Sequence, residues 1–418
     1  MRTMKDSGLS WVGKIPSDWL AHPVYYYFGE RKNKNIFGQE DNLLSLSYGR
    51  VIRKDINTNG GLLPESFNTY NIVEAGDIII RPTDLQNDKK SLRTGLCLER
   101  GIITSAYIAL RPIRRLNSGF FRYLLHAYDI SKVFYNMGNG VRQGLNFSEF
   151  SRLMVFEPPI EIQDKITQYL DTATAKVDEI ISDIQTQIDT LEQYKRSIIT
   201  ETVTKGLNPD AEMKDSGIQW VGQMPLAWDA VPNKYLMYKV KNICPVYNGE
   251  DILSLTTNGV IIRDLNGGGK MPTSFDGYQK VTPGNLLMCL FDIDVTPRCI
   301  GLVKNFGLTS PAYSQFVIRT GAYAPYYYYY YLMVDYTKEL LHMSKNLRHS
   351  LTEDQLGAIK APNPPYEEQV QIAEFLDKEC VEISRVIEDK NKQLATLDEY
   401  KKSLIFEYVT GKKEVPLS

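Results

Sequence analysis

The chain repeats itself once, and this duplication constrains its fold more than any other feature of the sequence. Residues 4–19 recur almost unchanged as residues 213–228, and every Trp of the chain lies in one of these two segments. The two copies also end alike, because residues 191–204 match residues 397–410. The sequence therefore predicts one structural unit that is present twice, a pseudo-twofold object suited to a partner with two halves.

Each copy closes with a long stretch of helical hydrophobic spacing. The stretch follows Pro158-Pro159 in the first copy and Pro364-Pro365 in the second, and its apolar residues recur in steps of three and four. Such steps form the seam of a coiled coil. A helix of about 42 residues would be about 63 Å long, which exceeds the interior of one domain. We therefore expect two long helices that pair antiparallel through a seam of Leu170, Val177, Ile180, Ile184, Leu191, Ile198, Leu376, Ile383, Val386, Leu394, Leu397 and Leu404. The alternative is that each helix packs only on the globular part of its own copy.

The globular parts have the patterns of mixed α and β structure. Short apolar runs typical of strands occupy residues 77–81, 107–111 and 285–289, and helical patterns follow near residues 120–135 and 326–341. We interpret the six consecutive tyrosines that open the last segment as residues that pack around a helix, rather than as a platform for stacking bases. The expected fold class is α+β, with two mixed α/β domains separated by two long antiparallel coiled-coil helices.

The expected segments differ in charge. They are a first globular domain, a first helix, a second globular domain, a second helix and a tail, at residues 1–160, 161–206, 207–366, 367–413 and 414–418. The first domain carries 21 Lys and Arg against 15 Asp and Glu, whereas the helix after it carries 5 against 9. Although the formal net charge of the chain is −2, the globular parts are more basic than the helices.

A set of short motifs occurs twice in the same order. Each copy opens with Ser-Gly, Trp-Val-Gly and Pro-x-x-Trp, continues with a Gly before a strand and a Pro-Pro pair before the helix, and closes with Tyr-Lys. The closing motifs read Tyr194-Lys195-Arg196-Ser197 and Tyr400-Lys401-Lys402-Ser403. Together these motifs resemble the specificity subunit (HsdS) of type I restriction-modification systems over essentially the whole chain.

The resemblance implies a division of labour within a larger complex. Each globular domain would be a target recognition domain that reads one half of a bipartite site in double-stranded DNA. The helices would dock two methyltransferase subunits, and restriction/translocase subunits would join them. The chain itself would be non-catalytic and would bind no cofactor, because S-adenosylmethionine, ATP and Mg are expected on the partner subunits. We also expect a cytoplasmic protein without a membrane partner, since no apolar stretch approaches the roughly 20 residues that cross a bilayer.

Polar and basic residues in matching loops are the candidates for contact with DNA. Base edges are read by polar side chains, and Lys and Arg position a protein on phosphates. The candidates of the first copy are Ser47, Tyr48, Arg50, Arg53, Lys54, Arg81, Asn87, Lys89, Lys90, Arg93, Arg142 and Gln143. Those of the second copy are Thr256, Thr257, Asn258, Arg263, Arg298, Asn346 and Arg348.

Two other functions stay open. Asn363-Pro364-Pro365-Tyr366 has the form of an adenine-methyltransferase motif and would make the chain an autonomous DNA methyltransferase. Its counterpart is Glu157-Pro158-Pro159-Ile160, which lacks both the amide and the aromatic ring. The chain could also be a structural connector with two heads that never touches DNA. The five Cys and four His residues show neither metal-ligand nor disulfide spacing, so we expect no metal and reduced thiols.

Overall fold

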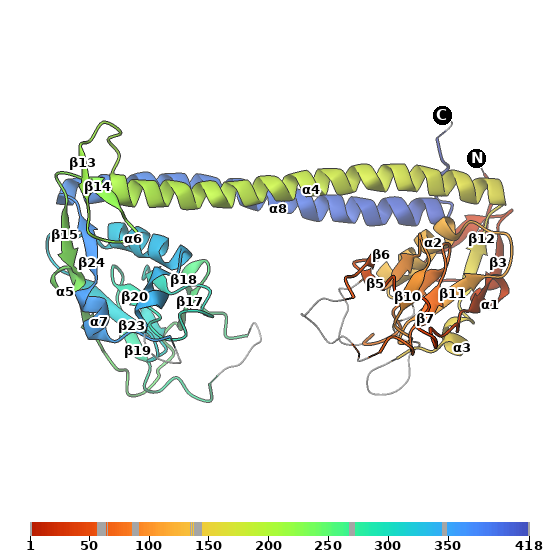
Figure 1. The fold of residues 1–418 in the computed structure, drawn as a ribbon, viewed down its shortest axis with the longest axis horizontal. Helices are drawn as coiled ribbons and strands as arrows, with labels where there is room; N and C mark the ends of the chain where they lie inside the picture. Colours follow the sequence, from red (N-terminus) through yellow and green to blue (C-terminus); the bar gives the residue numbers. More distant parts are fainter. Residues whose placement is uncertain are drawn as a thin grey trace. The chain divides into compact units, whose positions relative to one another are not determined.

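A computed structural model describes residues 2–56, 64, 66–85, 92–133, 135, 137, 144–266, 272–344 and 349–416 (Figure 1). The chain divides into two compact units. The first unit comprises residues 1–184 and 392–418, and the second comprises residues 185–391. Each unit therefore contains the globular head of one copy together with parts of both long helices.

The first unit is built on a four-stranded antiparallel sheet. Its strands, in spatial order, are β4 (Phe28–Glu30), β11 (Ile108–Pro112), β8 (Ile78–Ile80) and β9 (Thr94–Leu96). Four strand pairs accompany it, namely β1 (Met4–Asp6) with β2 (Lys14–Pro16), β3 (Leu20–Pro23) with β12 (Met154–Glu157), β5 (Leu44–Ser47) with β6 (Arg50–Arg53), and β7 (Asn71–Val73) with β10 (Gly101–Ile103). The helices of this head are α1 (Val24–Tyr27), α2 (Ser118–Ile130) and α3 (Phe147–Phe150).

The second unit repeats this topology element by element. Its four-stranded sheet has the order β16 (Met237–Val240), β23 (Ser314–Ile318), β20 (Leu286–Met288) and β21 (Ile300–Leu302). The strand pairs are β13 (Met213–Asp215) with β14 (Gln223–Pro225), β15 (Asp229–Pro232) with β24 (Lys360–Asn363), β17 (Leu253–Thr256) with β18 (Gly259–Ile262), and β19 (Gln279–Val281) with β22 (Gly307–Thr309). Its helices are α5 (Asn233–Leu236), α6 (Ala324–Tyr336), the 3-10 helix η1 (Glu339–Met343) and α7 (Glu353–Ala358). The predicted duplication and the α+β class are confirmed.

The two long helices begin and end in the same way. Helices α4 (Ile160–Lys205) and α8 (Tyr366–Val409) both start after a Pro-Pro pair. Proline has no backbone N–H and its ring clashes with the preceding helical turn, so neither helix extends further toward the N-terminus. Gln163 in α4 and Gln369 in α8 donate from Nε2 to the carbonyls of Pro158 and Pro364, at 2.9 and 2.8 Å. The same two side chains accept a backbone N–H of the adjacent head through Oε1. One glutamine therefore fastens the start of each helix to the head of its own copy.

The end of each helix, by contrast, packs on the head of the other copy. Gly206 and Gly411 follow α4 and α8 with φ of 77° and 69°, a left-handed conformation that ends a helix at low cost only for glycine. A Cβ on Gly206 would lie 3.1 Å from the Trp228 ring, and one on Gly411 would lie 3.1 Å from the Trp19 ring. Within each unit the start of one long helix thus accompanies the end of the other, so the helices run antiparallel, as predicted.

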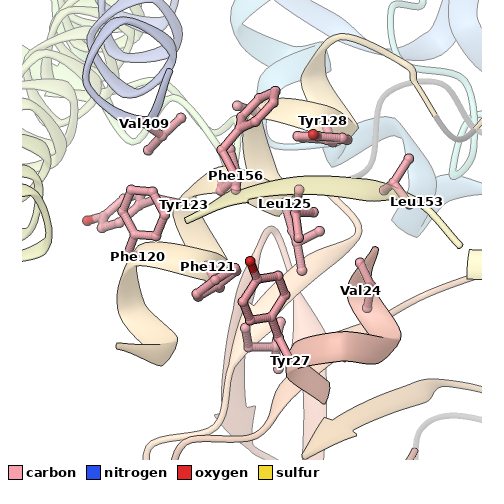
Figure 2. Packing of buried hydrophobic residues seen from close by; sticks show 14 of the residues in the cluster. Val24, Tyr27, Phe120, Phe121, Tyr123, Leu125, Tyr128, Leu153, Phe156 and Val409 are labelled. Carbon is pink, nitrogen blue, oxygen red and sulfur yellow. The ribbon is translucent and has the colours of Figure 1, made fainter. Parts of the chain in front are cut away.

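The hydrophobic cores show the same exchange. The core of the first unit joins α2 and the start of α4 to Leu404, Ile405, Tyr408 and Val409 at the end of α8. Figure 2 shows Val409 beside Phe156 and Tyr123 of the first head. The core of the second unit likewise includes Ile199 and Val203 from the end of α4. Burying such a side chain contributes about 1.5–3 kcal/mol. The alternative in which each helix packs only on its own copy is therefore wrong.

Ten of the twelve predicted seam residues are buried or half-buried, and two are exposed. Leu170, Val177, Ile184, Leu376, Ile383 and Leu404 are buried, and Leu191, Ile198, Leu394 and Leu397 are half-buried. Ile180 and Val386 are instead 47% and 39% exposed. With 3.6 residues per turn, each lies about 60° around its helix from the buried residue three positions earlier, outside the buried stripe. The stripe continues through Ile188 in α4 and Cys380 in α8.

The tyrosine run packs as predicted. Tyr326, Tyr327, Tyr329, Tyr330 and Tyr331 are buried on all sides of α6. The Tyr326 hydroxyl donates to the Val203 carbonyl at 3.0 Å, and the Tyr329 hydroxyl donates to Asp377 Oδ1 at 2.6 Å. These hydroxyls join α6 to both long helices, which leaves them unable to stack bases.

Candidate functional site

Each head presents a β-hairpin at the same place in its fold. The turn of the β5–β6 hairpin is Tyr48-Gly49, and the turn of the β17–β18 hairpin is Thr257-Asn258. Tyr48 and Gly49 have φ of 46° and 77°, and two successive positive φ values suit the right-handed twist of a two-residue hairpin. The positive φ strains the backbone of Tyr48, because a residue with a Cβ rarely adopts it. The Tyr48 side chain is 87% exposed.

A glycine in the neighbouring sheet positions each hairpin. A Cβ on Gly95 in β9 would lie 2.5 Å from Leu46 of the first hairpin. A Cβ on Gly301 in β21 would lie 2.5 Å from Val260 of the second. Because any larger residue would push the hairpin away, these glycines let both hairpins pack closely on their sheets. The two turns are therefore presented on matching frameworks but carry different side chains.

The arginines of the first hairpin are engaged with acidic residues, although they remain largely exposed. Arg53 donates from Nε to both carboxylate oxygens of Glu99, at 2.8 and 2.9 Å. These hydrogen bonds lower the pKa of Glu99 and raise that of Arg53. Arg50 donates from Nη2 to Asp178 Oδ2 on α4 at 2.6 Å. Lys54, just after the hairpin, is exposed. The hairpin thus has a basic outer face that is oriented by its acidic partners.

The prediction that Arg93 contacts DNA is wrong, because the side chain is fully buried. Its Nε donates to the Tyr135 hydroxyl at 2.9 Å, and its other nitrogens donate to the carbonyls of Arg81, Thr83 and Asp84. Its backbone N–H donates to Asp129 at 2.6 Å. A buried guanidinium must find such partners, so Arg93 holds residues 81–84, which follow β8, in place.

The candidates of the second hairpin are mostly neutral. The Thr256 hydroxyl donates to the Gly259 carbonyl at 3.0 Å and accepts the Asn258 N–H at 3.1 Å. Thr257 and Asn258 are exposed at the turn. Arg298 is turned inward instead, where it pairs with Asp335 at 3.7 Å and lies 5.5 Å over the Tyr336 ring. Among the candidates of this head that the structure describes, the exposed ones are therefore the hydroxyl and amide side chains of Thr257 and Asn258, in contrast to the arginines of the first head.

The remaining candidates fall into two groups. Ser47, Arg81 and Arg263 are half-buried next to the hairpins or the sheet. Seven lie outside the described residues, namely Asn87, Lys89, Lys90, Arg142, Gln143, Asn346 and Arg348.

A cavity of about 480 Å³ lies behind the first hairpin, and sequence reasoning missed it. It is bounded by the hairpin, by α2 and by the parts of α4 and α8 that belong to the first unit. Arg122 and His126 line it from α2, and Asp178, Lys401 and Lys402 line it from the long helices. Burial, together with the charges of Arg122 and Lys401, lowers the pKa of His126 to about 4. The sequence feature that pointed to this cavity was the spacing of Arg122 and His126, which lie four residues apart on one helix face.

The structure offers little for catalysis by the Asn363–Tyr366 segment. Asn363 Oδ1 already accepts hydrogen bonds from the Tyr327 hydroxyl at 2.8 Å and from Gln369 Nε2 at 3.2 Å. The amide oxygen is therefore engaged in holding the start of α8 against its head. The five cysteines are free and buried, as expected for reduced thiols. In the part of the chain that the structure describes, no cluster of His, Cys, Asp or Glu could hold a metal ion. Nor does any described helix have the length and apolar character needed to span a membrane.

Comparison with known proteins finds two relatives that are described as type I restriction enzyme specificity subunits. No protein-family model matches the chain. It is 24% identical over 343 residues to the type I restriction enzyme MjaVIII specificity subunit of Methanocaldococcus jannaschii, covering 76% of this chain and 75% of the relative. It is also 24% identical over 332 residues to the putative type I restriction enzyme MjaX specificity subunit of the same organism, covering 74% and 71%.

A solved structure shares the fold over nearly the whole length. It is described as the structural basis of complex assembly and conformational transition of the type I R-M system. The match has a TM-score of 0.69 and 13% sequence identity, and it covers 96% of this chain and 99% of the other. At 13% identity the match shows the fold alone, which in this chain consists of two heads and two long helices.

Proposed function

We propose that this chain, which is homologous to the specificity subunits of type I restriction enzymes, is the non-catalytic DNA-reading subunit of such a complex. Each head reads one half of a bipartite site in double-stranded DNA. The methyltransferase subunits supply the methyl transfer, and restriction subunits supply cleavage and translocation. The cofactors S-adenosylmethionine, ATP and Mg belong to those partners.

The observation that carries the proposal is the pair of hairpins on matching frameworks. Gly95 and Gly301 hold the hairpins against their sheets in the same way, yet the turns are Tyr48-Gly49 and Thr257-Asn258. A major-groove reader needs polar side chains at a fixed distance from the base edges, and their chemistry decides which bases fit. One framework with two sets of tips therefore suits two different half-sites.

The long helices support docking of two identical partners. Tyr194 on α4 and Tyr400 on α8 occupy equivalent positions in the two copies, and they are 51% and 54% exposed. Each belongs to a Tyr-Lys motif that recurs in both copies. Exposed aromatic residues are frequent anchors of protein interfaces. The same anchor presented once in each unit fits two copies of one methyltransferase subunit.

Exchange of one hairpin turn tests DNA reading. Thr257→Tyr with Asn258→Gly writes the residues of the first turn into the second head, whose hairpin has the same strand register. The variant is expressed with its methyltransferase subunits, and the methylated sequences are mapped. We expect the half-site read by the second head to change or to lose discrimination, while the other half-site stays as it was. If methylation continues with both halves unchanged, the hairpins do not read DNA.

Methyl transfer by the purified chain tests the absence of catalysis. With labelled S-adenosylmethionine and DNA we expect no transfer by this chain alone and transfer by the assembled complex. Transfer by the chain alone that is abolished by Tyr366→Ala would establish an autonomous methyltransferase instead.

A further inference from the structure

One carboxylate in the first unit connects the hairpin to both long helices. Asp178 on α4 accepts Arg50 Nη2 through Oδ2 at 2.6 Å, and it accepts Lys401 Nζ of α8 through Oδ1. Its side chain is 29% exposed, that of Lys401 is 27% exposed, and that of Arg50 is 70% exposed. The Lys401 bond fixes the carboxylate within the helix pair. The Arg50 bond then fastens the hairpin to this fixed point.

The second unit keeps half of this arrangement and lacks the other half. The equivalents of Lys401 and Asp178 are Lys195 and Ser384, and Lys195 Nζ donates to the Ser384 hydroxyl at 2.8 Å. The equivalent of Arg50 is Gly259, because the two hairpins pair in the same register. The link between the helices is thus present in both units. The acid and the arginine occur together in the first unit and are both replaced in the second.

The cavity explains why this ion pair matters for the hairpin. The space of about 480 Å³ separates the inner side of the hairpin from α2 and the long helices. Packing therefore cannot fix the hairpin against the helices there, and the Arg50–Asp178 pair spans the edge of this space. In the second unit the equivalents of Arg122 and Ile130 are Tyr328 and Tyr336, which are half-buried and pack against the core of that head.

We propose that Asp178 is a positioning residue which, through Arg50, fixes the first hairpin relative to the long helices and so sharpens the discrimination of the first half-site. The second half-site is read without such a contact. This inference rests on the proposed function, since it assigns a specificity role within the same hairpin.

The structure provides a clean substitution. Asp178→Ser gives the first unit the residue that the second unit carries, so Lys401 keeps a hydroxyl partner while Arg50 loses its carboxylate. Asp183→Ser is the matched control, because Asp183 is an exposed residue further along the same helix. Arg50→Ala removes the other partner, and its effect should not add to that of Asp178→Ser.

Hydrogen exchange of the full-length chain measures the position of the hairpin directly. Because an exposed ion pair contributes only weakly to stability, amides of residues 44–53 should exchange about two to five times faster in Asp178→Ser. Residues 253–262 should be unchanged, and the difference should shrink in high salt. Unchanged exchange of the first hairpin, or equal acceleration in Asp183→Ser, would overturn the inference.

Methylation mapping with the assembled complex measures the consequence. For Asp178→Ser we expect methylation to spread to sequences with mismatches in the first half-site, with the second half-site read as before. Faster exchange without any spread would show that the pair steadies the hairpin but does not govern reading, which overturns the specificity role. The proposed function would survive that result, because its own tests are the turn exchange in the second head and methyl transfer by the chain alone.

Discussion

Replacing Ile199 by alanine tests the exchange of helix ends, on which the architecture depends. Ile199 belongs to the first copy, yet it is fully buried in the core of the second unit. Removing a buried Ile side chain to Ala costs about 2–5 kcal/mol, through the lost transfer energy and the cavity left behind. A loss of about 3 kcal/mol would raise the open population of the second unit about a hundredfold. The first unit should keep its stability.

Hydrogen exchange resolves the two units, which a single melting curve of a chain with several cooperative parts does not. In Ile199→Ala, slowly exchanging amides of β20, β21 and α6 should lose protection by about that factor. Amides of β8, β9 and α2 should not. Ile180→Ala, on the same helix but 47% exposed, should lose less than about 1 kcal/mol. The reasoning is refuted if the first unit loses protection instead, or if the two variants behave alike.

Three further substitutions have outcomes that follow from local geometry. Gly411→Ala should lower the melting temperature more than Gly222→Ala, because both positions have positive φ but only a Cβ at Gly411 would meet Pro16, at 2.5 Å. Arg93→Leu should destabilise the first unit by about 3–5 kcal/mol, measured by hydrogen exchange of its slow amides, because it leaves the buried carbonyls of Arg81, Thr83 and Asp84 without their donor. Since the folded pKa of His126 is about 4, below its ordinary value, the folded state binds fewer protons than the unfolded chain between about pH 6.5 and 4. Stability of the first unit should therefore fall by up to about 3 kcal/mol over that window, and His126→Leu, which introduces the residue found at the equivalent Leu332, should remove this dependence.

Features repeated in both copies were predictable from the sequence. The duplicated opening, the Pro-Pro pairs and the two apolar stripes led to the two heads and the antiparallel helices. The strands after Gly76 and Gly284 followed from short apolar runs, and the packing of the tyrosine run followed from its alignment with the helical pattern of residues 120–123. A pattern that recurs at equivalent positions in both copies reflects a shared structural requirement, whereas a match in one copy alone can arise by chance.

The errors arose where a local pattern was compatible with two environments. Arg93 sits among polar residues in the sequence and was assigned to a surface loop, yet the fold surrounds its guanidinium with carbonyls from residues 81–84. Ile180 satisfies a heptad rule but lies off a stripe whose true course passes through Val177 and Ile188. In both cases the deciding partners come from tertiary packing, which spacing along the chain does not report. Position-by-position comparison of the copies would have paired Asp178 with Ser384 and so pointed to an acid that the second copy lacks at this place.

The exchange of helix ends also explains where the two copies agree and where they differ. The end of each helix must fit the head of the other copy, so Gly206 and Gly411 both meet a Trp, and both Tyr-Lys motifs keep their lysine. A substitution at such a position in one copy therefore alters the packing of the core around the head of the other copy. A change at a hairpin turn alters neither core, because Tyr48 and its counterpart Thr257 are exposed. This coupling keeps the frameworks of the two copies alike and leaves the hairpin turns free to diverge, as the proposed reading of two different half-sites requires.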